Sequence, residues 1–495
     1  MSILYRTFAR LLCNPMRVVV IDEQKHWKAI EILLGSMRLA EVIEQTTSNA
    51  RIGIMLPTSG MFPMAAYASW SLDRTIVPVN YLLKPDDLQH LCDDSEIDTI
   101  ITVSPMLDFL KKIPSGVKFI RMDQIDFRTP PPLRWPVLNR KDDLAVILYT
   151  SGTSGRPKGV MLTHDNIESN INQCCRWIDF TTKDSMLGVL PQFHVFGLTV
   201  LTLLPLSKGM RVHYLARFQP SRIVQWMVRY KPTVFIAIPT MYNAILHVKN
   251  AGPEHFKSLK YVISGGEPLP EAVAEGYRKR FQVVINEGYG LTETSAVTHW
   301  CRPWEYRYKS VGMAIPDVEV RIVAIDEERE LPVGEDGEIR MRGPNMMKGY
   351  YHLPEDTEEA FDELGYFRTG DIGHVDEDGF LYITGRLKEM MIIGGENVFP
   401  RDIEEVLNQF ELVKNSVVIG VRDPSRGEIP IAFVELHEDG VGEDENIESE
   451  LRGYCRQSLP TYKVPREIYV VEELPRNPTG KILRRALCDP NPDRC

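Results

Sequence analysis

Short apolar runs alternate with longer amphipathic stretches through the first part of the chain. Ile52–Leu56, Thr75–Val79 and Leu144–Tyr149 have the length and the β-branched or apolar composition of buried strands. Further strand candidates are Thr233–Ile238, Tyr261–Ser264 and Val283–Asn286, and a helix is expected over Pro268–Arg280. Strands that alternate with helices in this way predict parallel α/β units.

The pattern changes from about Asp317, where polar and apolar residues alternate and acidic turns separate the runs. Three strands are expected here, at Val318–Ala324, Gly337–Arg342 and Gly379–Thr384. After about Lys388 a compact α+β pattern follows, with helices at Pro400–Phe410 and Ile447–Ser458 and strands at Ser416–Val421, Ile431–Leu436 and Glu467–Val471.

These patterns predict an α/β protein with a large N-terminal domain, residues 1–386. It consists of two α/β subdomains plus a small β-rich subdomain, and Thr129–Pro136 within it is expected to be a stiff, extended connector. A small, mobile α+β C-terminal domain follows, residues 387–495. The junction is not a Gly/Ser linker, so the expected motion is a pivot on a short hinge.

The net charge and the cysteine content restrict the possible functions and cellular locations of the protein. The net charge of −11 opposes a general electrostatic grip on nucleic acid. Eight cysteines are scattered without a C-x-x-C pair, which is typical of reduced thiols in a cytoplasmic protein. No transmembrane segment is expected, because the apolar run Leu198–Leu206 is too short. Residues 1–20 are read as an amphipathic first helix, with contact to a membrane surface as the alternative.

A loop suited to phosphate follows the strand Leu144–Tyr149 directly. Its candidate binding residues are Thr150, Ser151, Gly152, Thr153, Ser154, Gly155 and Lys158. Hydroxyls and freely oriented backbone N–H groups can surround phosphate oxygens, and the lysine adds a positive charge. The loop is not a Walker A motif, because Gly159 follows Lys158 where that motif has Ser or Thr.

Further motifs follow in order over nearly the whole chain. They are Pro191-Gln192-Phe193-His194, Ser264-Gly265-Gly266-Glu267-Pro268, Gly288-Tyr289-Gly290-Leu291-Thr292-Glu293-Thr294, Arg368-Thr369-Gly370-Asp371, Tyr382-Ile383-Thr384-Gly385-Arg386-Leu387-Lys388-Glu389 and Asn477-Pro478-Thr479-Gly480-Lys481. Through the loop and these motifs the chain resembles the adenylate-forming superfamily of acyl-CoA synthetases, luciferases and adenylation domains. Within it, the chain is most similar to bacterial medium- to long-chain fatty acyl-CoA ligases.

The resemblance implies an enzyme that uses ATP, Mg²⁺ and coenzyme A. A carboxylic acid, expected to be a fatty acid, would attack the α-phosphate to give acyl-AMP and pyrophosphate, and the acyl group would then pass to the thiol of CoA. Two alternatives within the family are an acyl-AMP ligase that loads a separate acyl carrier protein and an aryl-acid CoA ligase. An alternative from another class is an inactive nucleotide- or acyl-binding protein. Whether the protein forms a homodimer is left open by the sequence.

By the same resemblance, most of the motif residues bind the nucleotide. Tyr289 flanks the adenine, Thr292 holds the α-phosphate, Glu293 binds Mg²⁺, Asp371 accepts from both ribose hydroxyls and Arg386 contacts the same region. The other nucleotide or CoA contacts expected are Gly266, Glu267, Pro268, Gly288, Gly290, Leu291, Ile383, Gly394, Gly395 and Glu396.

The resemblance also predicts how the two half-reactions are separated. Lys481 enters between the carboxylate and the α-phosphate during adenylation, and Lys388 is the hinge on which the C-terminal domain then rotates. Rotation would bring the Gly394-Gly395-Glu396 turn to the pantetheine arm of CoA. His194 lies near the substrate carboxylate and gates the acyl pocket. The expected catalytic residues are therefore Lys481, Thr292, Glu293 and His194.

Overall fold

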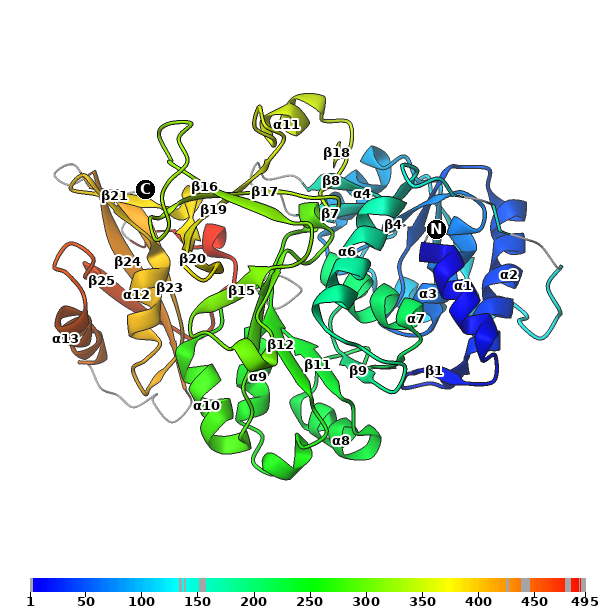
Figure 1. Ribbon diagram of the computed structural model, residues 1–495, viewed down its shortest axis with the longest axis horizontal. Coiled ribbons are helices and arrows are strands. Elements are labelled where there is room, and N and C mark those ends of the chain that lie inside the picture. Colours follow the sequence, from blue (N-terminus) through cyan, green and yellow to red (C-terminus); the bar gives the residue numbers. More distant parts are fainter. Residues whose placement is uncertain are drawn as a thin grey trace.

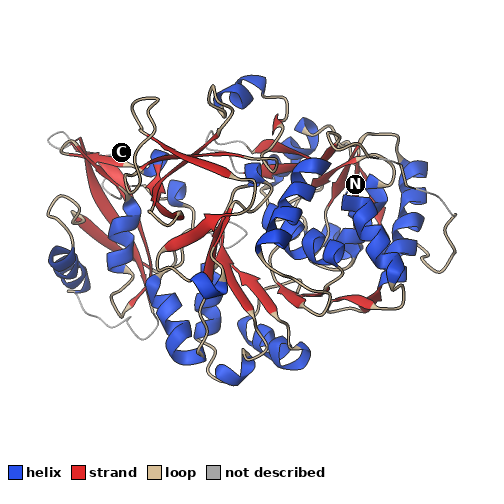
Figure 2. Ribbon diagram, in the orientation of Figure 1, coloured by secondary structure: helices blue, strands red, loops and turns tan. Residues whose placement is uncertain are grey.

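A computed structural model describes residues 3–132, 136–137, 139–150, 157–423, 427–437, 446–476, 482–488 and 490. Among these residues the strands form three sheets, and helices cover them (Figures 1 and 2). The helices are α1 (Ile3–Cys13), α2 (Ala29–Thr46), α3 (Met61–Trp70), α4 (Pro85–Asp94), α5 (Ser104–Phe109), α6 (His164–Trp177), α7 (Leu204–Lys208), α8 (Pro220–Tyr230), α9 (Pro239–Leu246), α10 (Glu271–Phe281), α11 (Pro354–Glu359), α12 (Pro400–Leu407) and α13 (Ile447–Ser458).

The first sheet contains the strand that leads into the predicted phosphate loop. Its order is β18 (Gly349–Tyr350), β8 (Lys158–Thr163), β7 (Leu144–Thr150), β4 (Thr75–Pro78), β3 (Arg51–Ile54), β5 (Thr99–Thr102) and β6 (Lys118–Arg121). The strands from β7 to β6 are parallel, whereas β8 and β18 add antiparallel pairs at one edge. Strands from both sides of the connector Thr129–Pro136 enter this sheet, because β7 follows the connector and pairs with β4, which precedes it.

The second sheet is longer and changes character along its width. Its order is β16 (Glu319–Val323), β17 (Gly337–Arg342), β19 (Phe367–Val375), β20 (Phe380–Arg386), β15 (Ser310–Ala314), β14 (His299–Trp300), β13 (Asn286–Tyr289), β12 (Tyr261–Gly265), β11 (Val234–Ala237), β9 (Ser185–Gly188), β10 (Arg211–Tyr214), β1 (Val18–Ile21) and β2 (His26–Lys28). Strands β13 to β1 are parallel, and those from β14 to β16 pair antiparallel. The predicted β-rich segment is therefore present, and its strands continue this sheet.

The third sheet belongs to the smaller C-terminal domain, which lies at the opposite side of the molecule from the N-terminal helices (Figure 1). Its order is β22 (Glu396–Val398), β21 (Met391–Ile393), β24 (Gly427–Leu436) and β23 (Val413–Asp423), and β25 (Glu467–Val471) pairs with β24. This sheet and helices α12 and α13 have hydrophobic cores of their own, separate from the large core of the N-terminal domain.

Two elements, α10 and β13, begin three residues later than predicted because of the backbone conformation before them. Helix α10 starts at Glu271 and not at Pro268, because Pro270 has an extended ψ of 137° and a residue before proline disfavours the α conformation. Strand β13 starts at Asn286 and not at Val283, because α10 ends with Gln282 in the left-handed region at φ 57°. Residues 283–285 therefore connect the end of α10 to the start of β13.

The two domains meet through polar contacts beside β20. The Lys309 ammonium lies 2.7 Å from a Glu405 carboxylate oxygen, and the Gln409 amide donates to Glu271 at 3.3 Å. The Arg401 guanidinium of α12 donates to the carbonyl of Ile383. Exposed ion pairs of this kind contribute little free energy. The buried Phe399 ring also packs against Gly385 at this contact.

Candidate active site

The hairpin of β7 and β8 carries the predicted phosphate loop. Its last register pair joins Thr150 to Lys158, which places the lysine at the exit of the loop. The predicted loop residues Ser151, Gly152, Thr153, Ser154 and Gly155 lie outside the described residues. The hairpin therefore fixes both ends of the loop.

Lys158 lies in a polar cluster with residues from a distant part of the chain. Its ammonium group forms an ion pair with Asp356 of α11 and lies 5.3 Å from the centre of the Tyr350 ring. The lysine side chain is 20% exposed and that of Asp356 is 34% exposed. The cation therefore remains accessible beside the loop that it is predicted to serve.

Three predicted nucleotide residues from three strands form one connected group. The Tyr289 hydroxyl donates to Asp371 Oδ2 at 2.5 Å, and Arg386 Nε lies 2.9 Å from Asp371 Oδ1. Burial raises the pKa of Asp371, and the nearby Arg386 guanidinium opposes that shift. The Asp371 side chain is 4% exposed and that of Arg386 is 59% exposed. Arg386 can thus reach a ligand while Asp371 stays fixed.

Glu293 lies in the 3-10 turn η4 (Thr292–Thr294). The Tyr350 hydroxyl donates to Glu293 Oε1 at 3.0 Å, and the backbone N–H of Met347 donates to the Glu293 carbonyl at 2.7 Å. Burial raises the pKa of the Glu293 carboxyl. The Thr294 hydroxyl accepts from the N–H of Leu291 at 2.9 Å and caps the turn. The Thr292 hydroxyl, in contrast, forms no hydrogen bond with any described residue.

Gly290 is required by the tight fold of its own turn. A Cβ added there would lie 1.9 Å from the carbonyl oxygen of Ala296, and Ser295 and Ala296 both have positive φ, 60° and 110°. This reason is separate from the close approach to the nucleotide that the motif predicts. Gly288 and Leu291 flank the same turn.

Lys388, in the 3-10 turn η6 (Leu387–Glu389), lies in the field of the same charged groups. Burial lowers the pKa of Lys388, the positive charges of Lys158 and Arg386 lower it further, and Glu293 acts in the opposite direction. Charges from three separate segments of the chain therefore act on one another in one region. This is the arrangement that a polyanionic substrate requires.

The segment after His194 lies against the glycine-rich turn at the end of β12. The N–H of Leu198 donates to the His194 carbonyl at 2.8 Å as the buried π-helix η2 (Phe196–Leu203) begins. A Cβ added at Gly265 would lie 3.3 Å from the Phe196 ring and 3.1 Å from the Gly288 carbonyl oxygen. The His194 segment, the Gly265-Gly266-Glu267-Pro268 turn and Gly288 are thus neighbours.

Ile383 lies on β20, the strand that carries Arg386, and its carbonyl accepts from Arg401. Other predicted residues are not brought to this group. Gly394 and Gly395 form the hairpin turn before Glu396 with φ of 63° and 91°, and a Cβ added at either meets no described atom within 4 Å. Lys481 lies outside the described residues, although Arg476 and Ile482 pair across the base of its loop.

Three residues of the site were not predicted from the sequence: Glu287, Tyr350 and Asp356. Burial raises the pKa of Glu287 to about 7, and the N–H of Leu269 donates to its carboxylate at 3.3 Å. The spacing of two residues between Glu287 and Tyr289 on one strand is a signal that could have found it, because such residues share a face. Tyr350 and Asp356 reach the site only through the fold.

Glu293 suits a Mg²⁺ ligand. Tyr350 engages one carboxylate oxygen, and the pKa of this carboxyl is raised because burial is incompletely compensated. A hard dication would supply the missing positive charge. The described residues contain no group of three acidic, histidine or cysteine side chains that could hold a metal. A single carboxylate agrees with the coordination of Mg²⁺, which usually keeps waters and substrate phosphates as ligands.

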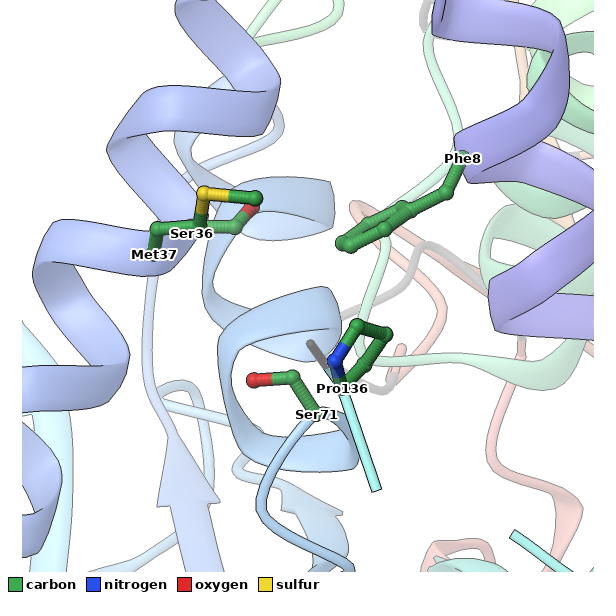
Figure 3. A pocket seen from close by; sticks show the side chains of 5 residues that line it. All are labelled: Phe8, Ser36, Met37, Ser71 and Pro136. Atoms are coloured by element: carbon green, nitrogen blue, oxygen red, sulfur yellow. The ribbon is translucent and has the colours of Figure 1, made fainter. Parts of the chain in front are cut away.

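A small cavity elsewhere in the N-terminal domain does not compete with this site. Phe8, Ser36, Met37, Ser71 and Pro136 line it between α1, α2 and α3 (Figure 3). Its volume of about 10 Å³ has room for one water molecule at most.

The described residues contain no helix that combines the length and apolar character needed to cross a membrane.

Comparison with known proteins gives matches over nearly the whole chain. The sequence model of the AMP-binding enzyme family matches residues 9–351, and that of the AMP-binding enzyme C-terminal domain matches residues 402–481. A long-chain-fatty-acid–CoA ligase of Bacillus subtilis is 32% identical over 505 aligned positions, which cover 93% of this chain and 89% of the ligase.

Solved structures agree with the fold. The ATP-bound MatB of Rhodopseudomonas palustris is 28% identical with a TM-score of 0.89, and 98% of each chain is covered. The o-succinylbenzoate–CoA synthetase of Bacillus subtilis, solved with ATP and a magnesium ion, is 28% identical with a TM-score of 0.85 and covers 97% of this chain and 98% of its own.

Proposed function

Because the chain belongs to the AMP-binding enzyme family and is an AMP-forming acid–CoA ligase that uses ATP, Mg²⁺ and CoA, we propose that the acid it activates is a fatty acid. The acid carboxylate attacks the α-phosphate of ATP, pyrophosphate leaves, and the CoA thiol then displaces AMP from the acyl-AMP.

The observation that carries the residue assignments is the meeting of charged groups from distant segments. The charges of Lys158, Glu293 and Arg386 all shift the pKa of Lys388, and Arg386 pairs with Asp371. We assign the ATP phosphates to Lys158 and Thr292, the ribose to Asp371, and Mg²⁺ to Glu293. Bound Mg²⁺ would neutralise phosphate charge. The fixed cations of the protein lower the barrier that an anion meets when it approaches a polyanion.

The choice of a fatty acid rests on two supports. The Bacillus subtilis relative is named a long-chain-fatty-acid–CoA ligase and covers most of this chain. The segment after His194 leads into η2, whose residues Gly197 to Leu203 are buried and carry no charge. A neutral apolar wall suits an alkyl tail and offers no partner to a second carboxylate.

An aryl acid is the second candidate, because the o-succinylbenzoate–CoA synthetase has the same fold at 28% identity. The test is ATP–pyrophosphate exchange with octanoate, palmitate, benzoate and o-succinylbenzoate, followed by AMP release on addition of CoA. We expect exchange with the aliphatic acids. Exchange with the aryl acids alone would overturn the proposal, and silence with all four would favour a protein that binds without catalysis.

The acceptor is tested in the same assay. AMP release should need CoA, and we propose that a phosphopantetheinylated acyl carrier protein does not replace it. Release with the carrier alone would identify an acyl-AMP ligase. Gel filtration of the full chain decides between a monomer and a homodimer.

We further propose that residues 387–495 rotate about Lys388 between the two half-reactions. Two features support this movement. Part of the contact between the domains consists of exposed polar pairs such as Lys309 with Glu405, which contribute little free energy. A Cβ added at Gly394 or Gly395 would meet no described atom within 4 Å, so this turn has free space around it, as expected of a part that engages CoA only after rotation.

We also propose a cytoplasmic location. Among the described cysteines, Cys92, Cys174 and Cys455 are buried and unpaired, and Cys13 and Cys488 are exposed and unpaired. Free thiols are typical of a reducing compartment.

A further inference from the structure

Tyr350 lies between the cation of the phosphate loop and the predicted metal ligand. Its ring centre is 5.3 Å from the Lys158 ammonium, and its hydroxyl donates to Glu293 Oε1 at 3.0 Å. One side chain therefore contacts two groups that are expected to act on the same triphosphate. The face of an aromatic ring attracts an ammonium ion, and a phenol orients the carboxylate to which it donates.

The backbone around Tyr350 is attached to both partners as well. Strand β18 pairs with β8 so that Gly349 faces Met161 and Tyr350 faces Val160, two residues beyond Lys158. On the other side, the N–H of Met347 donates to the Glu293 carbonyl at 2.7 Å. The short segment from Met347 to Tyr350 thus connects the exit of the phosphate loop to the turn that carries Glu293.

Helix α11 completes the cluster from above, where it packs beside β18 (Figure 1). Asp356 of this helix pairs with Lys158, and the Thr357 hydroxyl accepts from the N–H of Tyr350 at 2.9 Å. Lys158 is consequently held between an aromatic face and a carboxylate. The order of the groups is Asp356, Lys158, the Tyr350 ring and Glu293, so Tyr350 lies between the lysine and the second carboxylate.

We propose that Tyr350 is a positioning residue of the ATP–Mg²⁺ site, with separable functions in its two parts. The hydroxyl orients the Glu293 carboxylate for the metal, and the ring holds the Lys158 ammonium for the phosphates. This inference rests on the proposed assignments of Glu293 and Lys158.

The test measures ATP binding to the full chain by calorimetry without any acid, once with a metal chelator and once with saturating Mg²⁺. The ratio, the dissociation constant with chelator divided by that with Mg²⁺, reports how much the metal strengthens ATP binding. Tyr350→Phe keeps the ring and loses the donor, so the ratio should fall roughly tenfold while metal-free binding stays at the wild-type value. Tyr350→Leu loses both parts, so metal-free binding should also weaken roughly threefold.

Tyr351→Phe is the matched control, because the Tyr351 hydroxyl bonds to Glu96 at 3.2 Å and not to Glu293. It should change neither constant. An unchanged ratio in Tyr350→Phe would overturn the proposal, as would an equal weakening of metal-free binding by Tyr350→Phe and Tyr350→Leu, which a purely structural role would produce. Melting temperatures establish that each variant is folded, and Tyr350→Phe alone decides the case if the leucine variant is not.

Two further variants separate this inference from the assignments on which it rests. Glu293→Gln should lower the ratio, and Lys158→Ala should weaken metal-free binding. If both do so while Tyr350→Phe behaves as wild type, only the role of Tyr350 is wrong. If neither changes binding, the proposed nucleotide assignments fail and the inference fails with them.

Discussion

At the scale of single residues, the nucleotide site holds charges that the protein neutralises only in part. Burial raises the pKa of both Asp371 and Glu293, although Arg386 lies 2.9 Å from Asp371. Carboxylates held in this way have a free-energy cost in the empty protein, and a ligand that brings hydroxyl donors or a cation relieves it. The site is thus built to be completed by its substrate.

Asp371→Asn tests this view directly. The amide oxygen still accepts from Tyr289, but the charge that pairs with Arg386 and that would accept from the ribose is lost. The ATP dissociation constant should rise roughly tenfold or more, because a hydrogen bond to a charged group contributes ~1.5–3 kcal/mol. Calorimetry measures this change. Asp378→Asn, on the exposed turn between β19 and β20, is the control, and equal affinities in the two variants would contradict the assignment of Asp371.

His213 is a residue whose polar atoms have no visible role. It is 1% exposed, neither ring nitrogen has a hydrogen-bond partner among the described residues, and its ring lies 4.9 Å from that of Tyr230 at an angle of 33°. Phenylalanine would keep the ring contact and remove the unsatisfied nitrogens. His213→Phe should therefore raise the free energy of unfolding at pH 7.5 by about 1 kcal/mol. Urea denaturation measures this, and a clear loss of stability would show that the imidazole is satisfied in solution.

At the scale of elements, the regular strands and helices follow from the sequence, whereas their partners do not. Strand β17 and helix α13 match the predicted bounds because alternation and amphipathic spacing are local. Sheet order depends on long-range pairing, so the position of β1 beside β10 was not predicted. The same limit explains the site. Motifs identify Lys158 and Asp371, but Asp356 meets Lys158 only because β18 brings α11 to that edge.

The loop of Lys481 and the turn of Lys388 are expected to serve different half-reactions. Lys481→Ala removes the cation that enters between the carboxylate and the α-phosphate, so adenylation should slow by orders of magnitude while thioester formation from supplied acyl-AMP continues. Lys388→Pro restricts the hinge, so adenylation should continue while thioester formation slows. Pyrophosphate release and acyl-CoA formation measure the two steps separately.

The two variants serve as controls for each other. Near-normal pyrophosphate release in Lys481→Ala would refute the role of this lysine. Loss of adenylation with normal thioester formation in Lys388→Pro would refute the hinge.

At the scale of the whole molecule, buried histidines set how stability responds to acid. Burial lowers the pKa of His164 to about 4 and that of His213 and His299 to about 3. The unfolded chain, with a histidine pKa of about 6.5, binds more protons than the folded chain below that value. Stability is therefore retained above pH 6.5 and is lost progressively as the pH falls toward 4. Burial also raises the pKa of Glu287 to about 7, which favours the folded state in acid and offsets part of this loss.

Urea denaturation at pH 7.5 and at pH 5 checks this expectation. One buried histidine that stays neutral contributes a loss of about 2 kcal/mol between these two pH values. The stability advantage of His213→Phe over wild type should grow by that amount at pH 5. An advantage that does not change with pH would mean that His213 titrates normally in the folded protein.

The place of the first strand in the large sheet has a consequence for synthesis on the ribosome. Strand β1 pairs with β10, and α1 packs on α7, so these two elements wait for partners near residues 204–214. At ~5–20 residues per second, the wait is on the order of 10–40 s. During that interval α1, whose Ile3, Leu4 and Leu11 are buried in the finished protein, has α2 as a partner but lacks α7. Strand β1 and helix α1 therefore stay incompletely packed until the chain near residue 214 has been made.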